Sequence, residues 1–311
     1  MSQLLIAVFI FRASAFSLGG LGEDRSVFDQ PLIDIGSTAE LTLLLRPEFS
    51  LLNEGMNIRS IFWTNPFSFR LSAPINRNLQ ISFGNQERFN QDYDLYYEEN
   101  DLTLHLKGMG SIEEVNSTVQ LSSGHFRSAF RAGYLFGNAR EVWDYLIGDY
   151  SLVDTFNYQY RGYILSSGLQ YRFASIGFEG LGKLDMTKPS SDTTFDLPLR
   201  LTFKAVPRLF NGNAIVIIEK SIWDDPFLSP LRFQIGFSEG PYRIAYSYNP
   251  WYLESINEHS VNAHWRVPVS RMGVINLQLG IALRTKGEFR EFCITPQLKL
   301  EVNEFFTRRK K

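Results

Sequence analysis

Hydrophobic and polar residues alternate one by one over long stretches of this chain, and the alternation does not give way to a helical period. The clearest stretches are residues 195–204, 231–238 and 275–284. Successive side chains of a β-strand point to opposite faces of its sheet, so each stretch has one apolar and one polar face. The pattern therefore predicts an all-β protein.

The length of these stretches indicates the kind of β-protein. Several run for ten or more residues, which is long for a soluble strand and close to the ~9–11 residues with which a tilted strand crosses a bilayer. Outer-membrane barrels turn their apolar face to lipid and their polar face to the lumen. We predict a transmembrane antiparallel β-barrel of about 14 strands, with short periplasmic turns and longer extracellular loops. The side chains expected to face lipid are Leu199, Leu201, Phe233, Ile235, Leu277, Leu279 and Ile281.

Composition agrees with a barrel and excludes several other classes. Mean hydropathy is −0.14, and residues 4–11, the only long apolar run, are too short for a spanning helix of ~20 residues. Aromatic residues make up 14% of the chain, as expected where aromatic girdles mark both membrane interfaces. A net charge of −2 gives no reason to expect nucleic acid as a partner. The single cysteine, Cys293, excludes an intramolecular disulfide.

Residues 1–15 have most features of a signal peptide. Residues 4–11 form an apolar core, and residues 13–15 (Ala-Ser-Ala) form a cleavage signal. The positive region before the core is missing, so we expect the true start codon upstream; a buried N-terminal strand is the alternative. Residues 16–56 are predicted to be an N-terminal segment, either a plug or a first strand. A β-barrel over 57–303 and a basic periplasmic tail over 304–311 follow.

Aromatic and acidic residues concentrate in two expected long loops. These loops are residues 87–100 and 138–157, which we predict at the same end of the barrel, with a short helix within 141–147. The carboxylates of the first loop lack the spacing of an EF-hand, so a solvated loop is favoured over a calcium site and no metal is predicted. Exposed aromatic clusters usually mark contact sites. The residues expected to capture ligands at the extracellular side are Tyr93, Tyr96, Tyr97, Trp143, Tyr145, Trp251 and Tyr252.

Arginines dominate the face that is expected to point into the barrel. The inward acids that the alternation places are fewer, namely Asp101, Asp196, Glu291 and Glu301. A basic lumen concentrates anions, and arginine binds a carboxylate through two hydrogen bonds. The alternative is that these charges pair with acids and fill the lumen. The candidates for binding an anionic ligand, or for docking the acidic segment 16–56 as a plug, are Arg200, Arg232, Arg243, Arg266 and Arg284.

Histidine and serine form no recognisable catalytic arrangement. His259 and Ser260 are adjacent, so a strand sends them to opposite faces, and His264 has no serine two residues away. No G-x-S-x-G, H-E-x-x-H or C-x-x-C motif is present. The sequence therefore predicts that the chain is not an enzyme and uses no cofactor.

Several stretches carry a resemblance to a known family. They are residues 133–143 (GYLFG followed by E-x-W), 162–171, 232–250 (RFQIGFSEGPYRIAYSYNP) and 256–268, together with Glu291 and the later Glu304-Phe305-Phe306. Together they resemble the FadL-like outer-membrane β-barrel family, which includes long-chain fatty acid transporters and PorV-like proteins of type IX secretion. The resemblance covers residues 65–311. It departs at the front, because residues 16–56 lack the Asn-Pro-Ala element of the family's N-terminal hatch.

The resemblance implies passage of small hydrophobic or amphipathic molecules, such as fatty acids, across the bacterial outer membrane. We expect capture at the aromatic extracellular loops, then movement through the barrel or out of its wall. The alternative is a PorV-like shuttle or scaffold that binds secreted or surface protein partners at those loops. A third alternative is an outer-membrane lipid hydrolase. All three place the chain in contact with outer-membrane lipid.

Overall fold

The computed structural model describes residues 23–24, 39–54, 57–64, 67–90, 93–99, 102–147, 149–187, 192–222, 231–250, 257–269, 273–286 and 289–303. All regular secondary structure in these residues is β. No helix among them is long and apolar enough to cross a membrane. The strands are β1 (Glu23–Asp24), β2 (Glu40–Leu45), β3 (Pro47–Glu54), β4 (Asn57–Thr64), β5 (Ser68–Pro74), β6 (Leu79–Asn90), β7 (Tyr93–Glu99), β8 (Leu102–Ser123), β9 (Phe126–Ile147), β10 (Tyr150–Tyr171), β11 (Ala174–Thr187), β12 (Asp192–Asp196), β13 (Leu199–Ala205), β14 (Arg208–Leu209), β15 (Gly212–Ile222), β16 (Leu231–Glu239), β17 (Tyr242–Pro250), β18 (Asn257–Val269), β19 (Gly273–Lys286) and β20 (Phe289–Asn303).

Antiparallel ladders join these strands into a closed 14-strand barrel, which confirms the predicted fold. The ring closes where β20 pairs with β2, from Glu40↔Asn303 to Leu45↔Leu298. β3 continues β2, β4 leads into β5, β7 continues β6, and β12 leads into β13. The order around the ring is β2, β5, β6, β8, β9, β10, β11, β13, β15, β16, β17, β18, β19 and β20.

One end of the barrel has tight connections, and we call it the short-turn end. Two residues each join β8 to β9, β10 to β11 and β16 to β17. Gly124 and Gly240 adopt φ values of 58° and 55° there, a conformation that a Cβ disfavours. After β5, the side-chain oxygen of Asn76 accepts hydrogen bonds from the backbone N–H groups of Asn78 and Leu79, at 2.8 and 2.9 Å. Local turn chemistry therefore fixes this end.

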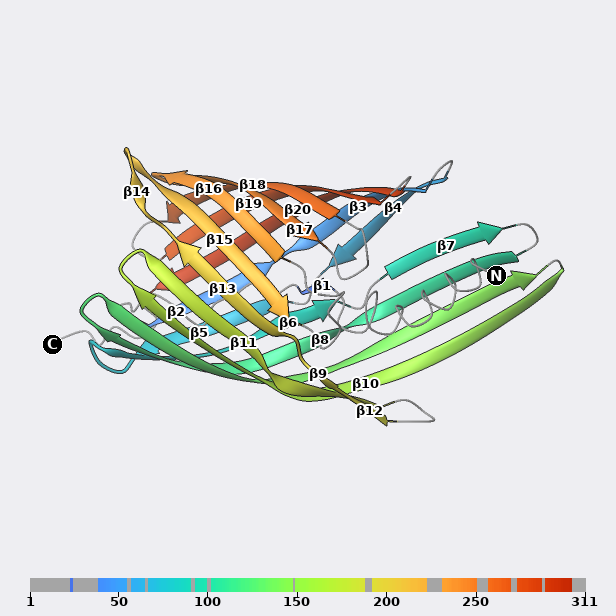
Figure 1. Cartoon of the computed structure of the whole chain (residues 1–311), viewed down its shortest axis with the longest axis horizontal. Coiled ribbons are helices and arrows are strands. Elements are labelled where there is room, and N and C mark those ends of the chain that lie inside the picture. Colours follow the sequence, from blue (N-terminus) through green and yellow to red (C-terminus); the bar gives the residue numbers. More distant parts are fainter. Residues whose placement is uncertain are drawn as a thin grey trace.

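The opposite end carries a four-stranded extension of the wall, which we call the projection. β8, β9 and β10 each have 22 residues, against 9 in β16 and β17. The ladder between β10 and β11 stops at Gln159↔Thr187 and that between β6 and β8 at Asn90↔Ser111, whereas β7, β8, β9 and β10 remain paired beyond these points. The projection consists of β7 and residues 102–110, 138–147 and 150–158. Figure 1 shows it extending well past the rest of the barrel.

The prediction that residues 87–100 and 138–157 form loops is therefore wrong, and so is the prediction of a short helix within 141–147. The described residues of both stretches are almost entirely strand. β8 pairs along the first stretch and with residues 138–147, and β9 pairs with residues 150–157, so residues that look like polar loop form one face of a sheet. Their predicted common location is confirmed, because Leu102 lies beside both Glu99 and Ile147.

Outward side chains of β9 change character along the strand. Phe130 and Tyr134 are 51% and 52% exposed, whereas Arg131 between them is 2% exposed. Beyond residue 136 the next outward side chain is Asn138. The apolar belt on this strand thus covers residues 126–136, which matches the ~9–11 residues needed to span a bilayer. The remaining residues of the strand belong to the projection.

The side chains that were predicted to face lipid lie on the outer surface of the barrel. The exposed fractions are 56% for Ile235, 41% for Leu277, 46% for Leu279 and 43% for Ile281. Leu201 pairs with Phe178, which is 42% exposed on the same face. Phe233 contacts the outward rings of Tyr246 and Tyr248, and Leu199 lies on the face of Leu201.

Part of the N-terminal segment belongs to the barrel wall. Residues 40–45 and 47–54 form β2 and β3, and β1 pairs with the end of β6 through Glu23↔Asn90 and Asp24↔Phe89. Wall strands therefore begin at residue 40, earlier than the expected start at residue 57. The expected signal peptide and the tail over 304–311 lie outside the described residues.

Candidate functional site

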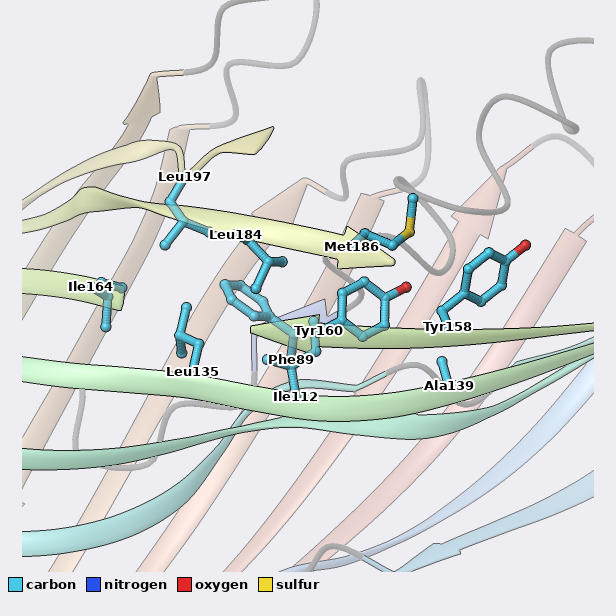
Figure 2. Packing of buried hydrophobic residues seen from close by; sticks show 10 residues of the cluster. All are labelled: Phe89, Ile112, Leu135, Ala139, Tyr158, Tyr160, Ile164, Leu184, Met186 and Leu197. Carbon is cyan, nitrogen blue, oxygen red and sulfur yellow. The ribbon is translucent and has the colours of Figure 1, made fainter. Parts of the chain in front are cut away.

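An apolar cluster lies inside the barrel, against the wall formed by β6 and β8 to β11. Barrel lumens are usually polar, yet Ile112, Leu135 and Leu184 point inward and are fully buried. Figure 2 shows the members converging on one region from these strands and from Leu197, which lies between β12 and β13. We call this set the lumen cluster; it consists of Phe89, Ile112, Leu135, Ala139, Tyr158, Tyr160, Ile164, Leu184, Met186 and Leu197.

A β-bulge places two members of this cluster. Gly180 has φ of 105°, and a Cβ there would lie 1.9 Å from the carbonyl oxygen of Pro198. The β10–β11 register shifts between Leu165 and Ser166, opposite this glycine. One extra residue in a strand reverses which side chains point inward. Odd-numbered residues of β11 face the lumen before the bulge and even-numbered ones after it, so Leu184 and Met186 turn inward.

A second apolar group lines the inner face of the projection. Leu104 and Leu106 are buried there, with Trp143 and Tyr145 packed against them. The ring of Trp143 also meets that of Phe156 edge-on, with centroids 5.0 Å apart. Phe156 in turn packs against the lumen cluster. A continuous apolar path therefore leads from the projection to the interior of the barrel.

A polar pair marks the point where this path enters the barrel. The hydroxyl of Tyr158 donates a hydrogen bond to Glu141 Oε2 at 3.0 Å. Burial, and secondarily the charge of Glu141, raises the pKa of the Tyr158 hydroxyl, so it stays protonated and remains a donor. The bond satisfies a carboxylate that is 3% exposed.

Buried ion pairs form a layer on the short-turn side of the lumen cluster. Glu179 binds Arg88 and Arg131 and lies 3.3 Å from Arg200. Arg88 is on β6 and Glu179 on β11, with β8, β9 and β10 between them in the ring, so their contact spans part of the lumen. The layer continues through Glu219, which lies 3.3 Å from Arg200 and 3.2 Å from Arg232.

A separate group surrounds Arg284 on the facing wall. Its guanidinium lies 2.7 Å from Glu258, 3.2 Å from Glu291 and 3.4 Å from Glu48. These residues come from β18, β19, β20 and β3, so the group joins the last described strands to β3.

The structure separates the five arginines that the sequence brings together. Arg200, Arg232 and Arg284 point inward as predicted, and each is ion-paired with glutamate. Arg243 and Arg266 lie on β17 and β18 nearer the short-turn end. The five therefore do not meet at one depth.

The expected shortage of inward acids is wrong. Glu48, Glu114, Glu179, Glu219 and Glu258 also line the interior. Conversely, the Asp196 side chain is 66% exposed beside Lys183, on the outer face, and Asp101 lies outside the described residues. The arginines identified from the sequence thus have more local counter-charge than the alternation suggested.

The aromatic candidates fall partly on the projection. Trp143 and Tyr145 line its inner face, and Tyr93, Tyr96 and Tyr97 belong to β7 at its edge. Trp251 and Tyr252 lie outside the described residues. The predicted separation of His259 and Ser260 is confirmed: Nδ1 of His259 lies 2.7 Å from the outward hydroxyl of Tyr246, whereas Ser260 shares the inward face with Asn262.

The hydrogen-bonded wall is interrupted beside the lumen cluster. β5 and β6 pair only from Phe69↔Asn85 to Pro74↔Gln80. Beyond Asn85, towards the projection, the same edge of β6 pairs with β1. Among the described residues, β4 pairs only with β3. Phe89 lies at this edge and belongs to the lumen cluster. The apolar interior is therefore adjacent to a break between β4 and β6.

Several solved structures of similar architecture are described as hydrocarbon channels or toluene transporters. No protein-family model matches the sequence, and no characterised protein matches it by sequence. The Pseudomonas putida toluene transporter TodX superposes with a TM-score of 0.58 at 10% identity, covering 94% of this chain and 97% of that one. The monoaromatic hydrocarbon channel CymD gives 0.57 at 10% identity, covering 95% and 97%. A Pseudomonas aeruginosa FadL homologue gives 0.53 at 7% identity, covering 86% and 90%. The chain thus has the FadL-like barrel fold, as the sequence resemblance implies.

Proposed function

We propose that this chain is a bacterial outer-membrane barrel that passes small hydrophobic molecules across that membrane. The observation that carries the proposal is the continuous apolar path from the projection to the lumen cluster. The path ends at a break in the wall. The short-turn end would face the periplasm and the projection the outside, as in outer-membrane barrels generally.

The projection supplies the capture step in this proposal. Trp143 and Phe156 present large apolar surfaces on its inner face. Moving apolar surface from water onto such rings is favourable by roughly 25 cal/mol per Å². The molecule then exchanges these contacts for those of the lumen cluster.

The ion-pair layer directs the exit. An apolar molecule that continued along the barrel axis would have to separate Glu179 from Arg88 and Arg131, which are buried. Breaking a buried ion pair costs several kcal/mol. Sideways movement past Phe89, between β4 and β6, separates only the two-residue ladder between β1 and β6 among the described pairings. We therefore expect release into the membrane through the wall.

The same layer bears on the ligand class. The cations next to the lumen cluster already bind glutamate, so a ligand carboxylate would compete with Glu179. An uncharged ligand has no such competitor. We propose that uncharged hydrocarbons, such as the toluene named for the similar transporters, pass more readily than fatty-acid anions.

Two tryptophan substitutions on one strand test the proposal. Ala139 is buried in the lumen cluster and Ala132 faces outward. Uptake of labelled toluene and of dodecanoate is measured in Gram-negative cells that lack their own transporter for either compound. Ala139→Trp should abolish protein-dependent uptake, whereas Ala132→Trp should leave it unchanged. Absence of uptake with the unmodified chain, or equal uptake by both variants, would overturn the proposal.

A free strand edge favours partner binding as a second function. Residues 150–157 of β10 pair with β9 on one side, and no described strand pairs with them on the other. Natural edge strands usually carry lysine, proline or a bulge, and this segment (YSLVDTFN) has none. Tyr150, Leu152 and Val153 are 83%, 59% and 57% exposed. An extended segment of a secreted protein could add a strand here.

A photo-crosslinker at Val153 tests this second function in intact cells. Adducts with an extracellular polypeptide should form and should disappear when Thr155→Pro and Ser151→Pro are introduced together, because proline cannot donate to an added strand. Hydrophobic uptake should be unchanged in that variant. Adducts that survive both prolines would exclude strand addition.

A further inference from the structure

The outer surface of the barrel contains a hollow on the wall opposite the lumen cluster. It has a volume of 670 Å³ and lies over β16 to β20. Its floor and walls follow two rows of residues that the ladders place side by side. The first row is Phe237, Ile244, Ala263, Leu279 and Pro296, and the second is Tyr242, Trp265 and Leu277. We call this hollow the outer groove.

The groove exists because one residue in its centre is small. Ala263 is directly opposite Ile244 on one side and Leu279 on the other, which are 57% and 46% exposed. Large side chains thus stand on both sides of a methyl group. Tyr242 and Trp265 close one end as a stacked pair, with ring centroids 6.4 Å apart and planes at 16°.

The groove belongs to one half of the membrane. Tyr242 follows the tight turn at Gly240, so the aromatic pair marks the short-turn end of the apolar belt. Tyrosine and tryptophan gather where the hydrocarbon of a bilayer meets its headgroups. Pro296 and Leu279 extend the groove away from that boundary, towards the middle of the belt.

We propose that the outer groove holds one acyl chain of a phospholipid from the leaflet at the short-turn end. The inference rests on the membrane placement made under the proposed function. All eight side chains of the two rows are apolar or aromatic. The other lining residues are Glu239, Arg243, His264 and Gln278, and the last three pair side by side at positions that alternate with the two rows and so point to the other face of the sheet. An empty space of this size would forfeit the dispersion contacts of its walls. Its volume falls within the ~300–1,000 Å³ of ligand sites.

Filling the groove tests the proposal. Ala263→Phe places a ring where the chain would lie, and Ala132→Phe adds the same ring to the outer face of β9, far from the groove. Each purified full-length protein is mixed in mild detergent with dipalmitoyl phosphatidylethanolamine, and bound lipid is counted by native mass spectrometry. The unmodified chain and Ala132→Phe should retain one lipid. Ala263→Phe should retain it about fivefold less, the change that a loss of ~1 kcal/mol produces.

A second readout locates the bound chain. Bromine atoms on the acyl chain should quench the fluorescence of Trp265, measured as the difference between the unmodified protein and Trp265→Phe. Equal lipid retention by Ala263→Phe and the unmodified chain would overturn the proposal. A two-copy mass that only the unmodified chain and Ala132→Phe form would instead assign the groove to a second copy of this chain.

The test separates this inference from the proposed function. Ala263 lies outside the apolar path, so uptake of toluene should be the same in Ala263→Phe and in the unmodified chain. Loss of lipid with normal uptake supports both ideas. Site-dependent lipid retention without any uptake would leave the groove assigned and would remove only the transport proposal.

Discussion

The wall formed by β8 to β11 and the wall formed by β16 to β18 differ in length and in inner surface. The first has strands of up to 22 residues and buries the lumen cluster. The second includes strands of 9 residues, and its inner face carries Asn262, which accepts a hydrogen bond from Gln278 at 3.3 Å. Extra length and apolar inner side chains occur on the same strands. Under the proposed function, the first wall contacts hydrophobic molecules, and the second chiefly closes the ring and contacts the membrane.

The ion-pair layer, which joins the two walls, gives the largest expected effect. Glu179→Leu leaves Arg88, Arg131 and Arg200 around an apolar side chain. Removing one partner from such a buried group costs about 3–5 kcal/mol. Urea unfolding of the barrel refolded in lipid vesicles measures this. The double variant Glu179→Leu with Arg131→Met should recover part of the loss; a single-variant change below about 1 kcal/mol would show that these contacts contribute little.

Arginine scanning along β9 tests the division of one long strand into belt and projection. Phe130 and Leu146 share the outward face and are 51% and 43% exposed. Phe130→Arg near the middle of the belt should lower the free energy of unfolding by about 2–4 kcal/mol. Leu146→Arg, near the tip, should change it by no more than about 0.5 kcal/mol. Equal costs at the two positions would place the projection inside the membrane.

Removing one hydroxyl from each wall should give the smallest effects. Tyr158→Phe breaks the bond to the buried Glu141 and should cost about 0.5–1.5 kcal/mol. Tyr246→Phe loses a bond to His259 at the exposed outer surface and should cost less. Chemical unfolding of both variants at neutral pH makes the comparison. A larger cost for Tyr246→Phe would mean that the outer aromatic group, not the inner pair, is the better packed.

Tyr158 also predicts a dependence on pH. Its pKa is raised in the folded chain, so the unfolded chain loses the proton first, near pH 10. The folded state binds more protons above that pH, and stability must fall as pH rises. The free energy of unfolding should therefore decline more steeply between pH 9.5 and about 11 in the unmodified chain than in Tyr158→Phe. Parallel declines would show that other groups dominate.

Most of the fold could be predicted from the sequence because alternation is a local property. Leu277, Leu279 and Ile281 were correctly assigned to the outer face from their polar neighbours alone. The projection was missed because its outward residues, such as Asn138 and Arg140, are those of a loop, and only the pairing with β8 shows that they are strand.

The lumen cluster was missed for a different reason. Without the bulge at Gly180, the alternation of Ile176 and Phe178 would continue outward through Leu184 and Met186. A glycine within a strand is a weak sign of a bulge, so the reversal could have been suspected but not established. The ion pairs depend on strands that are distant in sequence, such as β6 and β11, and alternation carries no information about them.

The two strands that border the break in the wall, β6 and β4, are held in place to different degrees. On one side of the break, β6 pairs with β8 along its whole length, and Arg88 of β6 forms an ion pair with Glu179 across the lumen. On the other, β4 is held among the described residues only by β3. A force that widens the break should therefore displace β4 more easily than β6. Under the proposed function, we expect the β3–β4 hairpin to move outward when a bulky molecule leaves through the break.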